Sequence, residues 1–570
     1  MNPAAHDTES RRISPVHCLY HWAQKTPNSV YLTQPLNDGT VVDYTWQQTL
    51  DEVQRMASYL LSLKLPENRH IALLGNNSAH WIMSDLAIWM AGHISVPLYP
   101  TLSGETAQYI LEHSEVKLMF IGKLDGKSDT WLDVKEVIST DLPCITLPMA
   151  PEFRGQERDK SWQDIVKNTT PVNDMKLPEA NNLATIIYTS GSTGKPKGVI
   201  HDFKTLMHVA NNMEEQFGLG PNERLLSYLP LAHCLERVII ETVSLHTGCH
   251  IFFADSLDTF VADLGRARPT MFISVPRLWM KFQSGINDKI PPTLQKILFA
   301  LPILGKFLRG RILQQLGLDQ VRLAVTGSAP LPQAVISWYQ SLGLDLLEGY
   351  GMTENAAYSH LNPTSANRLG TVGKPLNEVI CRLSDEGEVQ LKGPGTMLGY
   401  YKEPEKTAET MTADGYLKTG DLGEIDSDGY LKLTGRIKDI FKTSKGKYIA
   451  PVPIELKLGE SLSIEMVCVG GGILPQPIAL VILDEEVQKS LHKSGDRSAL
   501  ETEFEALLKK VNNTLESHEK LAFIVIMKEP WTMQNGLLTP TMKIQRQKVE
   551  DTYVDEFEKW KKQNRKIVWV

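Results

Sequence analysis

The sequence has no long apolar run and no apolar segment at its start. Nowhere in its 570 residues is there a stretch near the ~20 apolar residues that a membrane-spanning helix needs. The first residues, MNPAAHDTESRRISP, are polar and lack the apolar core of a signal peptide, so we expect residues 1–12 to be a flexible arm. These absences predict a cytoplasmic protein, with peripheral contact at the inner face of a membrane left open.

Clustered cysteines and an excess of positive charge are also missing. The six cysteines are scattered, and no two have the CxxC spacing of a zinc or redox motif, so we expect reduced, buried side chains. Acidic residues outnumber basic ones by 67 to 59, and the net charge of −8 argues against a general nucleic-acid-binding protein. We find no internal repeat and no low-complexity segment.

The chain does contain enough residues for several hydrophobic cores, and about three or four domains or subdomains are expected. Residues 51–65 have apolar positions at helical spacing, whereas HIALLGNN (70–77) and VKLMFIG (116–122) are typical of buried strands. Strands and helices alternate in this part of the chain. The order predicts a layered α/β fold with a mostly parallel sheet.

A different pattern begins in residues 391–433, where glycines separate short segments. Asp414 and Asp428 are each followed by glycine, which predicts tight hairpins in a small antiparallel β unit. Strand-like segments and a charged helix at 497–516 then predict a small α+β domain. We therefore expect a flexible arm, a large N-terminal domain with a small β subdomain, and a small mobile C-terminal domain, at residues 1–12, 13–436 and 437–570.

One loop is rich in glycine, hydroxyl groups and lysine. In YTSGSTGKPKGV (188–199), glycines allow close backbone approach to a ligand, and hydroxyls with Lys195 and Lys197 supply donors and positive charge. This composition predicts a polyphosphate site, with a solvated surface loop as the alternative. A Walker-type P-loop is excluded, because Pro196 follows the Gly-Lys pair where that motif has Ser or Thr.

Seven motifs occur in order along residues 186–543. After the loop come LPLAH (229–233), GSAPL (327–331), EGYGMTE (348–354), KTGDLG (418–423), GRIKD (435–439) and NGLLTPTMK (535–543). Together they resemble the adenylate-forming enzymes: acyl- and aryl-CoA synthetases, nonribosomal adenylation domains and firefly luciferase. YLPLAHCLERV (228–238) and SVPRLWMKF (274–282) are most similar to the long-chain fatty acyl-CoA synthetases of that superfamily.

The resemblance implies a two-step reaction with ATP, Mg²⁺ and CoA. A carboxylate attacks the α-phosphate of ATP, giving an acyl-adenylate and pyrophosphate, and a thiol then displaces AMP. The implied enzyme is an acid–thiol ligase, a long-chain fatty acid–CoA ligase. Two alternatives stay open: a fatty acyl-AMP ligase that loads an acyl carrier protein or another acceptor, and a non-catalytic acyl or nucleotide sensor.

The resemblance also implies catalytic and phosphate-binding residues. Lys543 is the implied adenylation catalyst, because a cation near the α-phosphate and the carboxylate would neutralise developing charge. Thr353 would contact the α-phosphate, and Glu354 and Ser190 would bind Mg²⁺. The residues implied to bind the other phosphates of ATP are Thr189, Ser190, Gly191, Ser192, Thr193, Gly194, Lys195 and Lys197.

Further residues are implied to hold the nucleoside, the acyl group and the thiol. Tyr350 would stack on adenine, and Asp421 would accept hydrogen bonds from the ribose hydroxyls. His233 is at the acyl-pocket position and Lys438 at the hinge position, while Gly446 and Lys447 would shape the thiol channel. The complete set for adenine and ribose is Gly327, Ser328, Ala329, Glu348, Gly349, Tyr350, Gly351, Asp421 and Arg436.

The segment QKILFALPILGKFLRGRILQQL (295–316) is apolar and carries four basic residues. We expect two ordinary packed helices. Helices beside an acyl tunnel, or a basic amphipathic patch that touches a membrane, are the alternatives.

Overall fold

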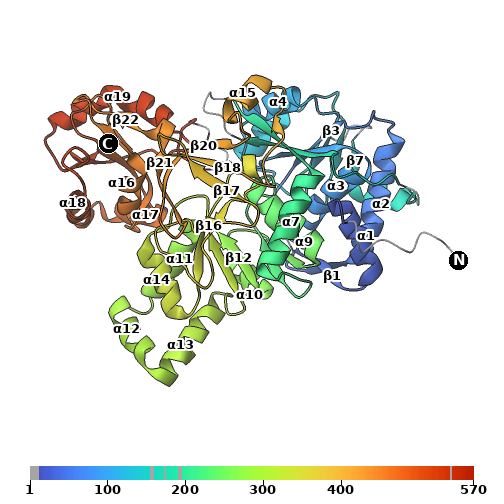
Figure 1. The fold of residues 1–570 in the computed structure, drawn as a ribbon, viewed down its shortest axis with the longest axis horizontal. Coiled ribbons are helices and arrows are strands. Elements are labelled where there is room, and N and C mark those ends of the chain that lie inside the picture. The colour runs from blue at the N-terminus through green and yellow to red at the C-terminus, as the bar shows by residue number, and fades with distance from the viewer. Residues whose placement is uncertain are drawn as a thin grey trace.

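The structure is a computed structural model that describes residues 12–36, 38–154, 159–172, 175–189, 195–533, 535–539 and 542–570. Figure 1 shows a broad N-terminal part, blue to yellow, and a smaller C-terminal part, orange to red, on its left. Both parts combine helices with strands, so the predicted α/β class is confirmed.

The largest sheet has eight strands in the order β19-β9-β8-β4-β3-β5-β6-β7. β3 (His70–Leu74), β4 (Ile94–Leu98) and β5 (Leu118–Ile121) are parallel, as expected. Their side chains are almost all buried, because helices cover both faces of the sheet. The other strands are β6 (Cys144–Thr146), β7 (Lys160–Ser161), β8 (Leu183–Thr189), β9 (Lys197–Asp202) and β19 (Gly399–Tyr400).

Helices and a four-stranded sheet complete this region. α2 (Trp46–Ser62) begins at a capping box formed by Thr45 and Gln48. α3 (Ala79–Met90) is mostly apolar and is buried along its whole length, including its polar residues His80, Ser84 and Asp85. The remaining elements are α1 (Pro15–Lys25), α4 (Gly104–His113), α5 (Asp129–Val137), α6 (Trp162–Asn168), α7 (Phe203–Phe217), β1 (Val30–Pro35), β2 (Val41–Thr45), β10 (Arg224–Ser227) and β11 (His250–Phe253).

A buried arginine lies in the segment that follows LPLAH. There α8 (Cys234–Glu236) continues into a π-helix, η2 (Arg237–Thr242), and α9 (Val243–Thr247). The Arg237 guanidinium pairs with Asp85 and lies 5.4 Å from the ring centroids of both Trp81 and Trp89. Burial raises the pKa of Asp85, and Arg237 opposes that shift. The pair therefore compensates two charges that would be costly to bury alone.

A five-stranded sheet forms the next subdomain. Its first three strands, β12 (Met271–Ser274), β13 (Leu323–Thr326) and β14 (Leu346–Tyr350), are parallel. On one face, Phe272 and Leu346 share an apolar cluster with the side chains of Trp279 and Tyr339. The other elements are β15 (His360–Leu361), β16 (Lys374–Pro375), α10 (Phe260–Ala267), α11 (Pro276–Asn287), α12 (Pro292–Ala300), α13 (Pro302–Gln315) and α14 (Gln333–Leu342). Segment 295–316 is therefore a pair of helices, and it projects from the body in Figure 1.

The predicted antiparallel β unit is confirmed. Its sheet has the order β17-β18-β20-β21, and the Asp428–Gly429 turn connects the last two strands. Gly429 has φ 84° and Gly415 has φ 83°, a region that favours glycine at these turns. The elements here are β17 (Ile380–Leu383), β18 (Glu388–Lys392), β20 (Leu417–Ile425), β21 (Leu431–Arg436), α15 (Pro404–Thr410) and the 3-10 turn η3 (Thr353–Asn355).

The chain after β21 passes through the 3-10 turn η4 (Ile437–Asp439) into the C-terminal part. Apolar clusters lie there that include no residue of the N-terminal part. Among the residues described, no helix has both the length and the apolarity to cross a membrane. The elements are β22 (Phe441–Lys442), β23 (Tyr448–Ile449), α16 (Pro451–Leu458), β24 (Ile464–Gly470), β25 (Ile478–Leu483), α17 (Glu485–Ser494), α18 (Ser498–Asn512), β26 (Ile524–Ile526), α19 (Arg546–Lys562) and β27 (Ile567–Trp569).

Candidate active site

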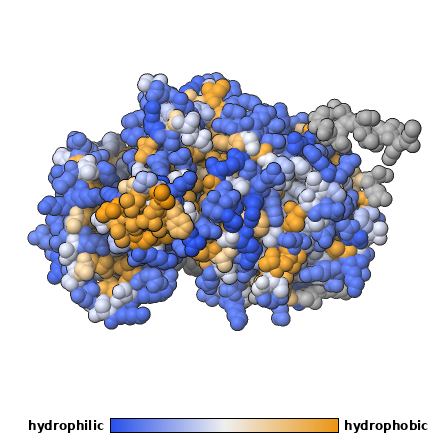
Figure 2. Space-filling model, turned by 90° about the horizontal axis from the view of Figure 1, so that it is seen from below, coloured by the Kyte–Doolittle hydropathy of each residue, from blue (hydrophilic) through white to orange (hydrophobic). Residues whose placement is uncertain are grey.

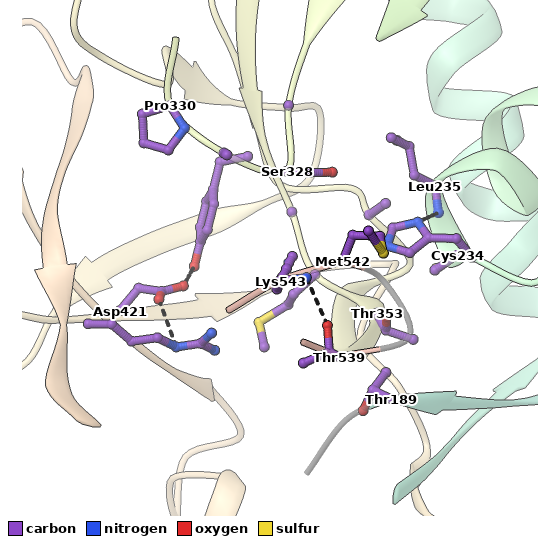
Figure 3. Close-up of a pocket in the computed structure, with 18 of the residues that line it drawn as sticks. Thr189, Cys234, Leu235, Ser328, Pro330, Thr353, Asp421, Thr539, Met542 and Lys543 are labelled. Carbon is purple, nitrogen blue, oxygen red and sulfur yellow. Dashed lines mark hydrogen bonds and ion pairs between the residues drawn. The ribbon is translucent and has the colours of Figure 1, made fainter. Parts of the chain in front are cut away.

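A cavity of about 2070 Å³ lies where the two parts of the chain meet. All seven motifs contribute residues to its wall, although they are spread over residues 186–543 of the sequence. Figure 3 shows Lys543 between Asp421 on one side and Thr353 and Thr189 on the other. The fold therefore assembles the motif residues around one space.

Lys543 reaches this cavity from a tight turn in the C-terminal part. The Thr539 N–H donates to the Lys543 carbonyl at 2.8 Å, and the Lys543 N–H donates to Thr539 Oγ1 at 3.0 Å. Met542 takes the left-handed conformation with φ 60°, which completes the turn. The Lys543 side chain is open to solvent within the cavity, while protein surrounds the cavity. Desolvation by the surrounding protein, together with the positive charge of Arg436, lowers the pKa of Lys543. Its ammonium group therefore lies in a site where it can neutralise an anion strongly.

Asp421, Tyr350 and Arg436 form a polar cluster at one side of the cavity. β20 and β21 pair Asp421 with Arg436, and Arg436 Nε lies 3.3 Å from Asp421 Oδ1. The Tyr350 hydroxyl donates to Asp421 Oδ2 at 2.6 Å. Because a carboxylate has about four acceptor positions, Asp421 retains capacity for further hydroxyl donors. The cluster is thus equipped to bind a vicinal diol.

The residues after β13 and along β14 form the adjoining wall. Gly327 lies against the backbone of Gly349, where a Cβ would come 3.5 Å from the Gly349 carbonyl oxygen. Ser328 has φ 69°, which turns the chain sharply at the cavity wall. Burial raises the pKa of Glu348 to about 7, and the Leu331 N–H donates to this side chain. Ala329 and Gly351 line the same wall.

Glu354 lines the cavity, and Lys197, the first residue of β9, lies close to Glu354 without lining the cavity. The Tyr400 hydroxyl donates to Glu354 Oε1 at 2.9 Å, and Lys197 Nζ lies 4.7 Å from the Tyr400 ring centroid. Burial lowers the pKa of Lys197. Thr353 is held by its backbone, because its carbonyl oxygen lies 2.8 Å from His201 Nε2. A carboxylate and a cation thus lie near the strands that flank the glycine-rich loop.

The loop itself is only partly described. β8 ends at Thr189 and β9 begins at Lys197, and these two residues pair in an antiparallel hairpin. Lys195 Nζ lies 5.4 Å from the Tyr109 ring centroid. Five residues predicted to contact phosphate lie outside the described residues: Ser190, Gly191, Ser192, Thr193 and Gly194.

His233 lies at the start of α8, where its Nδ1 accepts the Leu235 N–H at 3.2 Å. Burial, with the positive charge of Lys543, lowers the pKa of His233 to about 4. The imidazole is therefore neutral at pH 7, which suits a wall residue better than a charged one.

Nine apolar side chains also line this cavity, and we call the part that they border the apolar passage. They come from α7, α8, η2, β12, β13, β15 and the residue that follows β16, which are far apart in the chain, so no local motif marks them. They are Met213, Leu235, Ile239, Met271, Ile273, Leu323, Val325, Leu361 and Leu376. Tyr400 was also missed, because its role depends on the contact with Glu354.

The predicted hinge and thiol-channel residues lie elsewhere. Lys438 is in η4, between the last strand of the β unit and the C-terminal part. Gly446 has φ 78° in the turn between β22 and β23, and the Lys447 N–H donates to Thr443 Oγ1. Gly446 and Lys447 are not among the residues that line the cavity, whereas Lys543 is.

Comparison with curated proteins places these observations in a family. Long-chain-fatty-acid–CoA ligase 5 of Rattus norvegicus is 30% identical, over 88% of this chain and 82% of its own length. Fatty acyl-CoA synthetase A of Dictyostelium discoideum is 29% identical, over 92% of this chain and 87% of its own length. A long-chain-fatty-acid–CoA ligase of Mycobacterium bovis is 27% identical, over 98% of this chain and 96% of its own length.

Solved structures share the fold. The A domain of carboxylic acid reductase from Segniliparus rugosus, in complex with AMP and a carboxylic acid, has a TM-score of 0.78 at 20% identity and covers 98% of this chain and 96% of its own. An anthranilate CoA ligase in complex with anthranoyl-AMP has a TM-score of 0.74 at 22% identity. The match covers 96% of this chain and 98% of that structure's chain. The family described as AMP-binding enzyme matches residues 19–401 of this chain. The family described as AMP-binding enzyme C-terminal domain matches residues 438–564. The chain therefore belongs to the AMP-binding enzymes, the adenylate-forming family that its seven motifs resemble.

Proposed function

We propose that this protein activates a long-chain fatty acid with ATP and transfers the acyl group to CoA, releasing AMP and pyrophosphate. One observation carries the proposal: a single cavity combines the apolar passage near His233 with Lys543, Asp421 and Glu354. A fatty acid in that passage would keep its chain away from water and direct its carboxylate toward Lys543. The names of the curated relatives support the same chemistry.

In the first step the carboxylate would attack the α-phosphate of ATP. Adenine would lie against Gly327–Ala329 and Tyr350, and Asp421 would accept hydrogen bonds from the ribose hydroxyls. Lys543 would neutralise the charge that develops between carboxylate and α-phosphate, and Thr353 would contact the same phosphate. The bond between the α-phosphorus and the bridging oxygen then breaks, and pyrophosphate leaves.

The residues near the loop fit Mg²⁺ bound together with ATP. Mg²⁺ commonly takes one or two carboxylates plus substrate phosphates, and Glu354 offers one such carboxylate beside the cation Lys197. When bound, Mg²⁺ would neutralise phosphate charge. Ser190 stays a proposed second ligand.

In the second step the thiol of CoA would attack the acyl carbonyl carbon and displace AMP. Gly446 and Lys447 would shape the thiol channel, and they do not line the cavity that holds Lys543. We therefore propose that residues 437–570 rotate about Lys438 relative to residues 13–436 between the two steps. The protein would act in the cytoplasm.

Removing the Tyr350 hydroxyl tests the nucleoside cluster. Tyr350→Phe is expected to weaken AMP binding by about tenfold, because Asp421 loses one hydrogen bond and its orientation becomes less defined. Titration calorimetry with AMP would measure this. Tyr400→Phe is the matched control: it removes a tyrosine–carboxylate bond at Glu354 instead, and AMP affinity should stay unchanged. Equal losses in both variants would contradict the assignment of Asp421 to the ribose.

Filling the apolar passage tests the acyl site. Ile273→Trp, on β12, is expected to lower activity with oleate by about tenfold or more, since each excluded methylene forgoes ~0.8 kcal/mol of burial. Activity with butyrate should be unchanged, which also shows that the variant is folded. An equal decrease with both acids would mean that the substitution acts through the fold rather than through the passage.

The proposed function is tested most directly by AMP release from ATP and Mg²⁺ with carboxylates from acetate to oleate, each with and without CoA. AMP release that requires both a long chain and CoA is expected. Pyrophosphate release with long chains and no effect of CoA would instead favour an acyl carrier protein as acceptor, since an adenylation domain joined to a carrier domain shares this fold. ATP binding without pyrophosphate release for any acid would favour a sensor.

A further inference from the structure

The hairpin of α12 and α13 exposes large apolar side chains at its tip. Ile303 is 87% exposed, Ile297 is 64% exposed and Phe307 is 63% exposed. Figure 1 shows the hairpin projecting from the lower edge of the molecule, and Figure 2, seen from below, shows an apolar patch at that place. The exposed apolar residues of the patch are Leu294, Ile297, Leu301, Ile303, Leu304 and Phe307. Contiguous apolar patches on a protein surface mark an interaction site more often than scattered residues do.

The base of this hairpin is firmly anchored, so the tip is presented by an ordered element. Gln295 is buried: its Nε2 donates to Asn287 Oδ1 at 2.8 Å, and its Oε1 accepts the Trp338 indole N–H at 2.7 Å. Ile312 belongs to the apolar cluster of the subdomain. At Gly305 a Cβ would come 2.6 Å from the Phe299 carbonyl oxygen, so the two helices meet closely. The exposed apolar tip is therefore not a loose loop that collapses onto the body.

The charge of the hairpin is positive in a chain of net charge −8. Residues 291–318 include Lys296, Lys306, Arg309 and Arg311 and no acidic residue. In the described part of the chain, none of these four cations forms a salt bridge. Lys306 adjoins Phe307 in the sequence. Arg311 lies four residues after Phe307, which is one turn further along the same helix. Cations thus flank the apolar tip.

We propose that the α12–α13 hairpin docks on an anionic lipid bilayer. A helix with apolar side chains at the acyl boundary and Lys or Arg at the headgroups binds such an interface, and both features are present on this projecting tip. Near an anionic surface each cation adds about 1 kcal/mol of attraction, or roughly fivefold in partitioning. Fatty acids partition into bilayers, so docking would bring the cavity to a source of the substrate proposed above. The docking itself does not depend on that activity.

The test is sedimentation of the full-length protein with vesicles, measured without ATP or fatty acid. The protein is expected to bind phosphatidylglycerol–phosphatidylcholine vesicles at least about tenfold more tightly than phosphatidylcholine vesicles, and added salt should weaken binding. Ile303→Ser/Phe307→Ser should lower binding to the anionic vesicles by about tenfold or more. Lys306→Glu/Arg311→Glu should reduce it to the level seen with neutral vesicles.

A matched pair of exposed apolar residues lies outside the hairpin. Leu257 is 93% exposed and Val261 is 58% exposed, and Asp255 and Asp258 lie beside Leu257 in the sequence. Leu257→Ser/Val261→Ser should bind vesicles as the wild type does, and all variants should keep the wild-type melting temperature. The proposal is overturned if the wild type does not bind, or if the serine pair in the hairpin binds equally well. It is also overturned if the patch proves to join two copies: light scattering would then show a wild-type dimer that the hairpin variant converts to a monomer.

Discussion

Lys543→Ala is expected to lower the rate of adenylation by about 10²–10³-fold, the usual loss when one group that stabilises transition-state charge is removed. In the structure Lys543 lies in the cavity near Asp421, Glu354 and Arg436, so its charge is placed where a developing anion would be bound. ATP affinity should change by less than about threefold, because this contact is made mainly in the transition state. Carboxylate-dependent pyrophosphate release and ATP binding would be measured separately.

Two further variants make this result specific to Lys543. Lys447→Ala removes a lysine from the same part of the chain but outside the cavity, so adenylation should be nearly unchanged. Lys543→Arg keeps the positive charge. Wild-type adenylation by Lys543→Ala would contradict the role proposed for this residue.

The pH dependence of the same variants checks the charge. The pKa of Lys543 is lowered by burial and by Arg436, so its cation is lost at a lower pH than that of an exposed lysine. The kcat/KM for adenylation should therefore fall as pH rises in the wild type. Arginine stays protonated, so Lys543→Arg should lack this decline. The same decline in both proteins would show that another group titrates.

Lys438→Pro is expected to slow thioester formation by about 10²-fold while adenylation changes by less than about threefold, since misplacement of reacting groups costs rates of this order. Lys438 lies in the 3-10 turn that leads into the C-terminal part. Proline fixes its own φ near −65°, a value found in 3-10 turns, and also restricts the residue before it. The arrangement with Lys543 in the cavity would be kept, and rotation to present Gly446 and Lys447 would be hindered.

Single-turnover measurements separate the two steps. Acyl-adenylate is formed first without CoA, and CoA is then added to follow acyl-CoA formation. Lys438→Ala is the control, because it removes the same side chain without restricting the backbone, and both steps should proceed nearly as in the wild type. If the proline variant loses both steps equally, Lys438 is not the hinge.

Local features were determined by the sequence alone, because they depend on residues that are neighbours along the chain. The parallel strand at His70–Leu74 follows from a run of apolar residues, and the turn at Gly429 follows from an Asp-Gly pair. The seven ordered motifs were enough to indicate the family that the comparisons confirm. They also marked residues such as Lys543 and Asp421, which the fold brings to one cavity.

Contacts between distant segments were decided only by the tertiary structure. The wall of the apolar passage combines Met213, Ile239 and Leu323, and the hydrogen bond from Tyr400 to Glu354 joins residues that are 46 positions apart in the chain. The α12–α13 hairpin also shows that burial depends on the tertiary structure. We predicted two ordinary packed helices; the helices are present, but Ile303 and Phe307 are exposed, so the predicted packing is wrong for these side chains. Burial is a property of the whole fold, and a local pattern of apolar residues does not specify which surface covers them.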